Sequence, residues 1–261
     1  MVTISPNLVY KHLSSSPQLK SAFQLIEGDD EIVELLRMSN IMAVSRLRYN
    51  DHGIVHARIV AGTALELVDI LNSSNIVFTT LRDGTARTLD DIKIIMLLSA
   101  YFHDIGNSVH RTQHELIGVI IAKDIIHRIL KDLGYDTKRA IALRQEILHN
   151  IYSTAYDVKC LTIECSIIKL SDGLDMSEGR ARIPYRLGKM DMHAVSALSI
   201  KYVDIEKGVE KPIKIIVHMS EIAGLFQLEE VLLPKIKTGL LEDYIEIFIE
   251  NNGRLIKFYP L

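Results

Sequence analysis

A histidine and an aspartate stand side by side at the end of a strongly apolar stretch, which runs from Ile94 to Gly106 and contains His103-Asp104. The stretch is predicted to be a buried helix, because apolar residues cover all of its sides. An imidazole and a carboxylate that leave water for such an interior need partners there. One divalent metal ion can serve both groups, so the doublet predicts a metal site inside the fold.

The chain up to about residue 189 shows mainly helical periodicity. Apolar residues recur at helical spacing over residues 29–47, 52–71, 113–133, 137–152 and 157–174, and each of these segments is expected to be a helix. The helix that carries the His-Asp doublet should begin at Thr88, because Thr88-Leu89-Asp90-Asp91 has the form of a capping box. Gly134 is a suitable stop for the helix that ends there.

The pattern changes after about residue 189. Strand composition is found over residues 195–203, 213–218, 244–249 and 255–259, and a helical pattern covers 223–237. The sequence therefore predicts a mainly α fold, with a helical domain over residues 1–190 and a small α+β module with an antiparallel sheet over 191–261. The module has no histidine-carboxylate cluster and no glycine-rich phosphate loop, so we expect an interaction or dimerisation role rather than catalysis. Its sheet should pack against the helical domain or against a second copy.

The composition is that of an ordinary globular protein. Of 261 residues, 48% are hydrophobic and 24% are charged, and the formal net charge is −3. This charge gives no reason to expect a nucleic-acid polymer or a membrane surface as a partner. The sequence shows neither a signal peptide nor an apolar run of the roughly 18 residues that span a bilayer, so we expect a cytoplasmic location.

The two cysteines, Cys160 and Cys165, fall in one segment that is predicted to be helical. Their spacing within a helix and the expected cytoplasmic location favour two reduced, buried thiols over a disulfide. A metal site at this pair is not expected.

Two further residues extend the doublet into an ordered set. His56 lies upstream in a predicted helix, and Asp172 lies downstream in the helical segment Ile167-Ile168-Lys169-Leu170-Ser171-Asp172. A histidine, then His-Asp, then a distant aspartate, each in a helical context, resembles the HD superfamily of metal-dependent phosphohydrolases. The segment Phe102-His103-Asp104-Ile105-Gly106 is close to the family's usual His-Asp-Ile-Gly. The similarity covers about residues 45–180 and implies an HD-domain helical bundle.

The resemblance implies that His56, His103, Asp104 and Asp172 hold a metal ion. Each residue alone would be read as an ordinary core histidine or a helix cap, and it is the set of four in family order that favours the metal. Imidazole and carboxylate ligands suit Mn, Fe, Co, Ni or Zn, with Mg as a further choice. Such an ion activates water and polarises a phosphoryl oxygen, and Asp104 would act in catalysis by bridging metals or orienting the water.

Histidines at two more places raise the number of metal ions that we expect from one to two. Some HD families complete a dinuclear site with histidines in the positions of His114 and His149, and both match here in local sequence. Two metals can clamp the entering and the leaving oxygen of a phosphoryl transfer. The alternative is that both histidines face a solvated cleft or approach the substrate.

The chain departs from the family pattern at Asn107, where the family commonly has lysine after His-Asp-Ile-Gly. If that lysine neutralises phosphate, its charge must come from elsewhere, and Arg180 and Arg182 are the candidates, because arginine suits bidentate phosphate binding. We place His52, Asn107 and His110 as substrate contacts. His52 shares a helical face with the first metal-binding histidine but stands at the helix start, where capping or substrate contact is favoured over coordination.

On these grounds we expect metal-dependent hydrolysis of a phosphate ester, with a nucleotide or a related phosphorylated metabolite as the small substrate. Two alternatives stay open. The same ligand types serve HD-type di-iron oxygenases, and the domain could instead be a catalytically weak ligand sensor. A homodimer formed through the C-terminal module is a further expectation.

Overall fold

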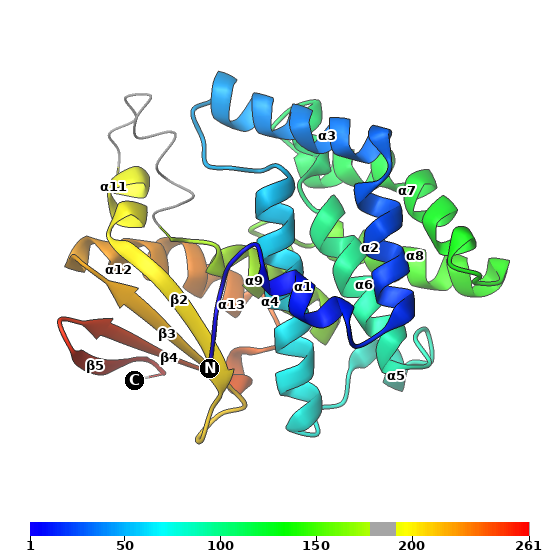
Figure 1. Ribbon diagram of the computed structural model, residues 1–261. Coiled ribbons are helices and arrows are strands. Elements are labelled where there is room, and N and C mark those ends of the chain that lie inside the picture. Colours follow the sequence, from blue (N-terminus) through cyan, green and yellow to red (C-terminus); the bar gives the residue numbers. More distant parts are fainter. Residues whose placement is uncertain (178–191, 261) are drawn as a thin grey trace.

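A helical body with a β-sheet at one end makes up the fold, as the computed structural model shows for residues 1–177 and 192–260 (Figure 1). The helices are α1 (Leu8–Leu13), α2 (Pro17–Glu27), α3 (Asp30–Asn40), α4 (Ile54–Ser73), α5 (Thr79–Arg82), α6 (Leu89–Phe102), α7 (His114–Asp132), α8 (Thr137–Tyr152), α9 (Ile163–Leu174), α11 (Met192–Leu198), α12 (Leu225–Gln227) and α13 (Leu233–Lys237). The shorter 3-10 and π turns are η1 (Ile41–Arg46), η2 (Ile105–Ser108), η3 (Ile222–Gly224), η4 (Leu228–Leu232) and η5 (Glu242–Tyr244). The strands are β1 (Val2–Thr3), β2 (Ile200–Lys207), β3 (Ile213–Met219), β4 (Ile245–Asn251) and β5 (Arg254–Tyr259).

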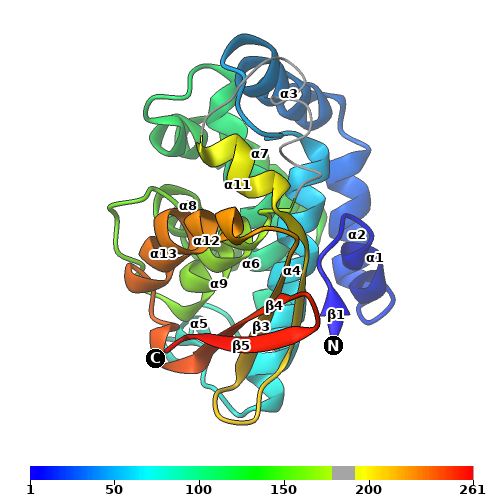
Figure 2. The same cartoon turned by 90° about the vertical axis from the view of Figure 1, so that its left-hand side faces the viewer.

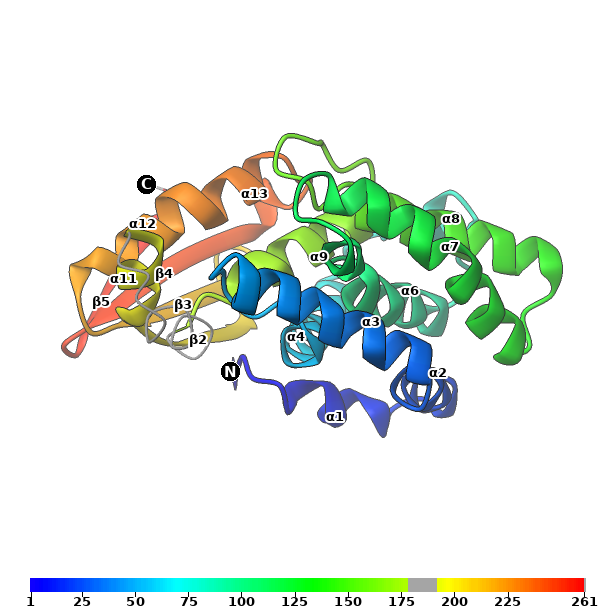
Figure 3. The ribbon, with the colours of Figure 1, turned by 90° about the horizontal axis from the view of Figure 1, so that it is seen from above.

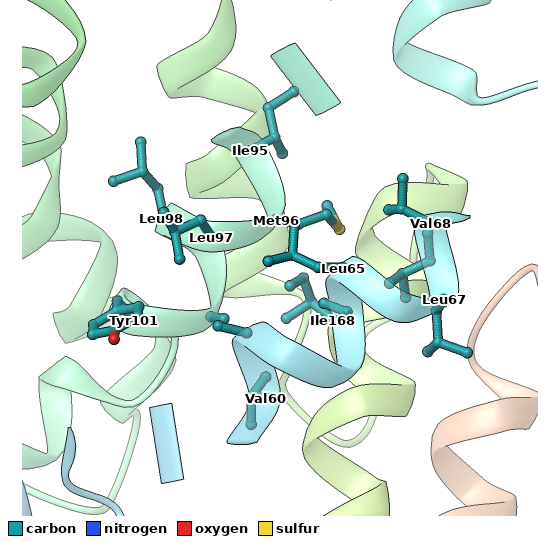
Figure 4. Close-up of a cluster of buried hydrophobic side chains, with 14 of the residues drawn as sticks. Val60, Leu65, Leu67, Val68, Ile95, Met96, Leu97, Leu98, Tyr101 and Ile168 are labelled. Atoms are coloured by element: carbon teal, nitrogen blue, oxygen red, sulfur yellow. The ribbon is translucent and has the colours of Figure 1, made fainter. Parts of the chain in front are cut away.

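The centre of the helical body is a hydrophobic core shared by α4, α6 and α9. Leu65 and Val68 of α4 meet Met96 of α6 and Ile168 of α9, and all four side chains are fully buried (Figure 4). Each side chain of this size contributes roughly 1.5–3 kcal/mol when it is buried. This packing fixes how each helix is turned about its axis, and it thereby fixes where the polar residues at the helix ends point. Although α6 is apolar on all sides, none of the described helices is long and apolar enough to cross a membrane.

The predicted start of α6 is confirmed. Thr88 caps the helix by accepting the backbone N–H of Asp91 at 3.1 Å, and the Asp91 carboxylate accepts the N–H of Thr88 in return at 3.1 Å. The reciprocal capping box satisfies two helix-end donors that would otherwise lack partners. Helix α7 ends before Gly134, whose positive φ of 87° favours glycine, and this stop is also as predicted.

The predicted antiparallel sheet of four strands is wrong in two respects, because one pair of strands is parallel and a fifth strand joins the sheet. The described residues form a five-stranded sheet in the order β1-β2-β3-β4-β5, in which β3 and β4 are parallel and the other pairs are antiparallel. The helical run between β3 and β4 returns the chain to the end where β3 began, so β4 must run in the same direction. Strand β1 has two residues, too few for a detectable alternation, and it forms the edge opposite β5 (Figure 2).

The segment 195–198 was predicted to be the start of a strand and instead lies in helix α11, so β2 begins only at Ile200. The apolar run Val195 to Leu198 has no clear period, and short runs of this kind do not distinguish strand from helix. The predicted domain boundary at residue 190 lies outside the described residues and stays a prediction. The sheet itself contains residues from both ends of the chain, because β1 pairs with β2.

The helical run from η3 to α13 packs the sheet against the helical body. Both η4 and α13 contact α9. Leu228, Leu232 and Ile236 belong to the same buried cluster as Ile215 of β3 and Ile247 of β4. From above, α4 and α9 lie between the sheet and the helices α6 to α8 (Figure 3).

The cysteine prediction is also wrong, because Cys160 and Cys165 form a disulfide. Helix α9 begins at Ile163 behind its N-cap Thr162, later than the predicted start at 157, so Cys160 lies in the preceding loop. Residues five apart in a continuous α-helix are about 8.7 Å apart at Cα, too far for a disulfide. The irregular backbone before α9 brings these two Cα atoms to 5.6 Å.

Candidate metal centre

Four polar side chains meet where three helix ends come together. His56 lies in the first turn of α4, His103 and Asp104 directly follow α6, and Asp172 lies in the last turn of α9. His56 is fully buried, and His103 and Asp104 are 2% and 5% exposed. The three ligand atoms offered by His56, His103 and Asp172 all lie within 4.8 Å of one another.

The distances between these atoms suit a metal ion. Nε2 of His56 lies 3.2 Å from Nε2 of His103 and 3.2 Å from Oδ1 of Asp172. Asp104 Oδ2 lies 3.4 Å from the first of these nitrogens and 3.3 Å from the second, and His103 Nε2 lies 3.8 Å from Asp172 Oδ1. Two ligands bound at about 2.1 Å from one ion are separated by about 3.0–3.4 Å when they are neighbours, so most of these separations match.

The hydrogen bonds of the two imidazoles identify which nitrogens are available. Nδ1 of His56 donates to Asp175 Oδ2 at 2.6 Å, and Nδ1 of His103 donates to the carbonyl of Ala100 at 2.8 Å. Both Nε2 lone pairs therefore face each other, an arrangement that is repulsive unless a cation or a proton lies between them. The outer partners fix each ring in the orientation that metal-binding histidines use.

The electrostatic environment of this cluster of histidines and aspartates favours the presence of a positive charge within it. Burial disfavours the charged imidazole of His103, but the neighbouring carboxylates of Asp104 and Asp172 outweigh it and raise the pKa of His103 to about 10. Burial likewise opposes ionisation of the two aspartates, yet the pKa values of both lie well below the ordinary value because of the facing cations and histidines. The donor set, its spacing and its potential fit a divalent metal, which His56, His103 and Asp172 could hold with Asp104 alongside.

Asp175 was not identified from the sequence. It follows Asp172 by three residues at the end of α9, and its carboxylate orients His56 from the side away from the cluster. Burial to 5% exposure and a 2.6 Å contact with a ligand histidine make it part of the site. Nothing in the segment Asp172-Gly173-Leu174-Asp175 reveals this pairing, because it depends on the packing of α9 against α4.

His114 lies beside the cluster. Its Nε2 is 3.2 Å from Asp104 Oδ1, the oxygen that does not face His56 and His103, and it also accepts a hydrogen bond from Arg111 at 3.1 Å. Gly106 permits this approach, because a Cβ there would stand 1.9 Å from the carbonyl oxygen of His114. If Asp104 Oδ1 held a second ion, His114 Nε2 would be close enough to serve as a further ligand of that ion.

His149, the other histidine of the expected dinuclear set, is placed elsewhere. Its Nε2 accepts the backbone N–H of Leu161 at 3.3 Å, its Nδ1 contacts the hydroxyl of Ser153, and burial lowers its pKa. It is not among the described residues that line the cavity next to the cluster. Among the described residues, contacts link the other five proposed metal ligands to one another, whereas His149 contacts Ser153 and Leu161.

The expected substrate contacts are placed in different ways. His52 precedes α4, is buried and lines the cavity. Asn107 does not line it and instead donates to Asp104 Oδ1 at 3.0 Å, which holds that carboxylate in place. His110 is exposed, and its Nδ1 accepts the N–H of Thr112. Arg180 and Arg182 lie outside the described residues.

The cluster opens into a cavity of about 530 Å³. The described residues that line it are Tyr49, Asn50, His52, His103, Asp104, Arg111, His114, Glu115, Thr154, Tyr156, Asp172, Gly173, Asp175, Met176, Gln227, Val231 and Lys235. The last three belong to the C-terminal module, for which we expected an interaction or dimerisation role rather than catalysis, and Lys235 forms an ion pair with Asp172 Oδ2. The sequence signal that was missed is their spacing of four residues, which places them on one helical face.

Comparison with known proteins agrees with the geometry. The family model described as HD domain matches residues 53–177, a range that contains the four core ligands. An uncharacterized protein from Methanocaldococcus jannaschii is 46% identical over 229 residues, which cover 88% of each chain. No solved structure matches. With the His, His-Asp and Asp residues of the family pattern gathered at three helix ends, the chain belongs to the HD-domain superfamily of metal-dependent phosphohydrolases.

Proposed function

We propose that this protein hydrolyses a phosphate ester of a nucleotide or of a related phosphorylated metabolite. The observation that carries the proposal is the pair of Nε2 atoms of His56 and His103, which face each other at 3.2 Å beside the Asp172 carboxylate. His103 and Asp172 line the cavity, and His56 is fully buried behind them. Membership of the superfamily supports the reaction class. The cavity volume of about 530 Å³ lies in the range of sites for small molecules.

The ligands would be His56, His103, Asp104 and Asp172, and the ion one of Mn, Fe, Co, Ni or Zn. When bound, such an ion polarises a phosphoryl oxygen and lowers the pKa of water. The chain's own contribution is positional. Asp175 keeps the His56 ring in its ligand orientation through the 2.6 Å hydrogen bond at Nδ1.

Asp104 has the geometry to position the attacking water. Its Oδ2 faces the two histidines, while its Oδ1 points to His114 at 3.2 Å and is held by Asn107. The two oxygens of one carboxylate thus serve different sides of the site. We propose that Oδ1 accepts a proton from the water as it attacks phosphorus, which places general-base catalysis on this residue.

The test is a substrate screen on the full chain. Protein purified without oxygen is analysed for metal, reloaded with each divalent ion and assayed for phosphate release from phosphomonoesters, phosphodiesters and nucleotides. The organic products are separated by chromatography as well, because hydrolysis of a diester yields a monoester and no inorganic phosphate. We expect turnover that depends on the metal, is lost on chelation and is lost in Asp104→Ala. Asp83→Ala is the matched control, because Asp83 is an exposed aspartate paired with Arg82 outside the cavity.

The proposal fails if the metal-loaded protein hydrolyses no substrate of the panel. Oxygen uptake is measured in parallel on the iron-loaded protein. Uptake that is lost in Asp104→Ala, with no phosphate release, would assign the site to oxidation instead.

A further inference from the structure

One face of the C-terminal helical run forms a wall of the cavity. Gln227, Val231 and Lys235 follow one another at intervals of four residues across α12, η4 and α13, and all three line the cavity. An interval of four residues is close to one helical turn. The π-helical stretch η4 has wider turns, which help to keep the three side chains on the same face of the helical run. A module with no catalytic motif in its sequence therefore presents a lysine to the metal cluster.

Lys235 is held against one of the ligand carboxylates. Its ammonium group forms a hydrogen-bonded ion pair with Asp172 Oδ2, while Asp172 Oδ1 faces His56 Nε2 at 3.2 Å. The Lys235 side chain is 10% exposed. Because a single carboxylate separates the ammonium group from the metal position, a group bound to the metal on the cavity side would lie within reach of Lys235.

The approach of α13 to α9 is built into the packing. Gly173 stands at the contact, where a Cβ would come within 3.0 Å of Leu232 and 3.1 Å of the Lys235 side chain. Pro234 has no N–H to donate to the carbonyl of Glu230, four residues earlier, and the hydroxyl of Tyr156 donates to this carbonyl instead. The helix that carries Lys235 is thereby tied to the loop before α9.

A second cation stands at the other ligand aspartate. The Arg111 guanidinium lies 3.8 Å from Asp104 Oδ1, donates to His114 Nε2 at 3.1 Å and has a side chain that is 38% exposed. Each of the two ligand carboxylates therefore has one cation next to it, and both cations line the cavity. Asn107, an uncharged residue that does not line the cavity, contacts both Asp104 and Arg111.

The charge balance gives these cations a role in binding an anion. Among the described residues, four carboxylates line the cavity, those of Asp104, Glu115, Asp172 and Asp175, and together they carry four negative charges when ionised, two more than one divalent ion supplies. A phosphate dianion would be repelled from such a site unless further cations face it. Lysine and arginine are the side chains that bind phosphate oxygens with strong, charge-assisted hydrogen bonds.

We propose that Lys235 and Arg111 form a phosphate clamp and that the substrate is a phosphomonoester. This inference rests on the proposed function. A monoester phosphate carries two charges and three non-bridging oxygens, enough for one metal and two cations, whereas a diester carries one charge and two such oxygens. In the hydrolysis the oxygen of water bonds to phosphorus, the ester P–O bond breaks, and the leaving oxygen takes a proton, which gives an alcohol and inorganic phosphate.

The first test measures binding of inorganic phosphate, the product, to the metal-loaded full chain by titration calorimetry. We expect Lys235→Met to weaken phosphate binding by about tenfold or more, because a charge-assisted hydrogen bond is lost. Lys235→Arg should restore most of the affinity. Lys237→Met is the matched control on the same helix, since Lys237 is exposed and does not line the cavity. Arg111→Met should weaken binding similarly, and its exposed side chain makes misfolding of that variant a small risk.

Metal content and the melting temperature of every variant are measured alongside. If Lys235→Met and Arg111→Met both bind phosphate as the wild type does, the clamp is refuted. If Lys235→Met alters metal affinity alone, the lysine only neutralises Asp172, and the proposal is refuted as well. If Lys235→Met does not fold, the Arg111→Met result decides.

Turnover separates this inference from the proposed function. A clamp that acts on the substrate predicts a higher KM for monoesters in Lys235→Met, with diester turnover changed much less. Preference of the wild type for diesters would overturn the assignment of a monoester even if the chain is a phosphohydrolase. Phosphate binding that depends on Lys235, in a protein that hydrolyses nothing, would support the clamp and refute the proposed function.

Discussion

The cavity has two walls with different origins. One wall is formed at the ends of α6 and α9, where His103, Asp104 and Asp172 line the cavity and contact the buried His56 of α4. The other wall is the helical run of the C-terminal module and carries Lys235. The first wall holds groups whose chemistry needs a cation, and the second supplies a cation to whatever enters. We infer from the contrast that the ends of α4, α6 and α9 hold the metal, while Lys235 of the C-terminal module, together with Arg111 before α7, binds the phosphate of the substrate.

The distinction between the two walls is wrong if the first wall does not hold the metal. Changing His103 to Ala or Asp104 to Ala should remove bound metal after gel filtration and reduce activity to background, while circular dichroism shows that the helices persist. The melting temperature should fall, because a ligand present at a hundred times its Kd stabilises the folded state by about 2.7 kcal/mol. Full metal content in both variants would contradict the assignment of the ligands.

A smaller effect is expected from the residue that orients the first wall. Asp175→Asn removes the charged acceptor at Nδ1 of His56 and should lower metal affinity by about 10- to 100-fold. Asp204→Asn is the matched control, because Asp204 contacts His218 Nε2 at 3.0 Å on the sheet. Equal metal affinities in the two variants, measured by competition with a chelating dye, would show that the outer hydrogen bond is unimportant.

The next prediction compares the two other histidines that were expected to bind metal, His114 and His149. His114 lies 3.2 Å from Asp104 Oδ1, whereas His149 accepts a backbone N–H from Leu161. If a second ion binds, about 3.5–4 Å from the first, His114→Ala should lower the metal stoichiometry more than His149→Ala does. Elemental analysis of both variants tests this. A larger loss in His149→Ala would restore the histidine pair expected from the sequence.

The contrast between the walls also marks the limit of prediction from sequence. His103-Asp104 was recognisable because burial and polarity conflict within a few adjacent residues, and the family pattern added His56 and Asp172. The start of α6 at Thr88 was predictable because a capping box is a local signal. These features depend on neighbours in the chain.

Other features depend on contacts between distant segments. Lys235 reaches Asp172 across 63 residues, and Asp175 reaches His56 across 119. The parallel pairing of β3 with β4 and the addition of β1 to the sheet follow from the path of the whole chain. The disulfide was missed because a helix was extended too far toward the N-terminus, an error of boundary rather than of element type.

The smallest expected effect concerns His12, a buried histidine that is not among the described residues of either wall. Burial lowers its pKa, but Glu66 and Asp69 of α4 outweigh this and raise it above 6.5. Lys11 and Lys93 complete the group of charges around these carboxylates.

A raised pKa means that the folded state holds the proton more tightly than the unfolded state does. The resulting stability is fully present below about pH 6.5 and is lost as the pH rises through the higher folded pKa. Denaturant unfolding should therefore show this contribution shrinking above pH 6.5 in the wild type and absent in His12→Gln. Unchanged metal content in His12→Gln would show that His12 affects stability and not metal binding. Loss of metal in this variant would show that α1 also supports the first wall.

The most direct test of the two-wall account is a crystal structure of the full chain grown with manganese and inorganic phosphate. Anomalous scattering should place an ion between Nε2 of His56 and Nε2 of His103, with the carboxylate of Asp172 as a ligand. Phosphate should lie on the cavity side of that ion, with its oxygens hydrogen-bonded to Lys235 and Arg111. An ion bound elsewhere at saturating manganese, or phosphate on the metal with both cations turned away from it, would contradict the account.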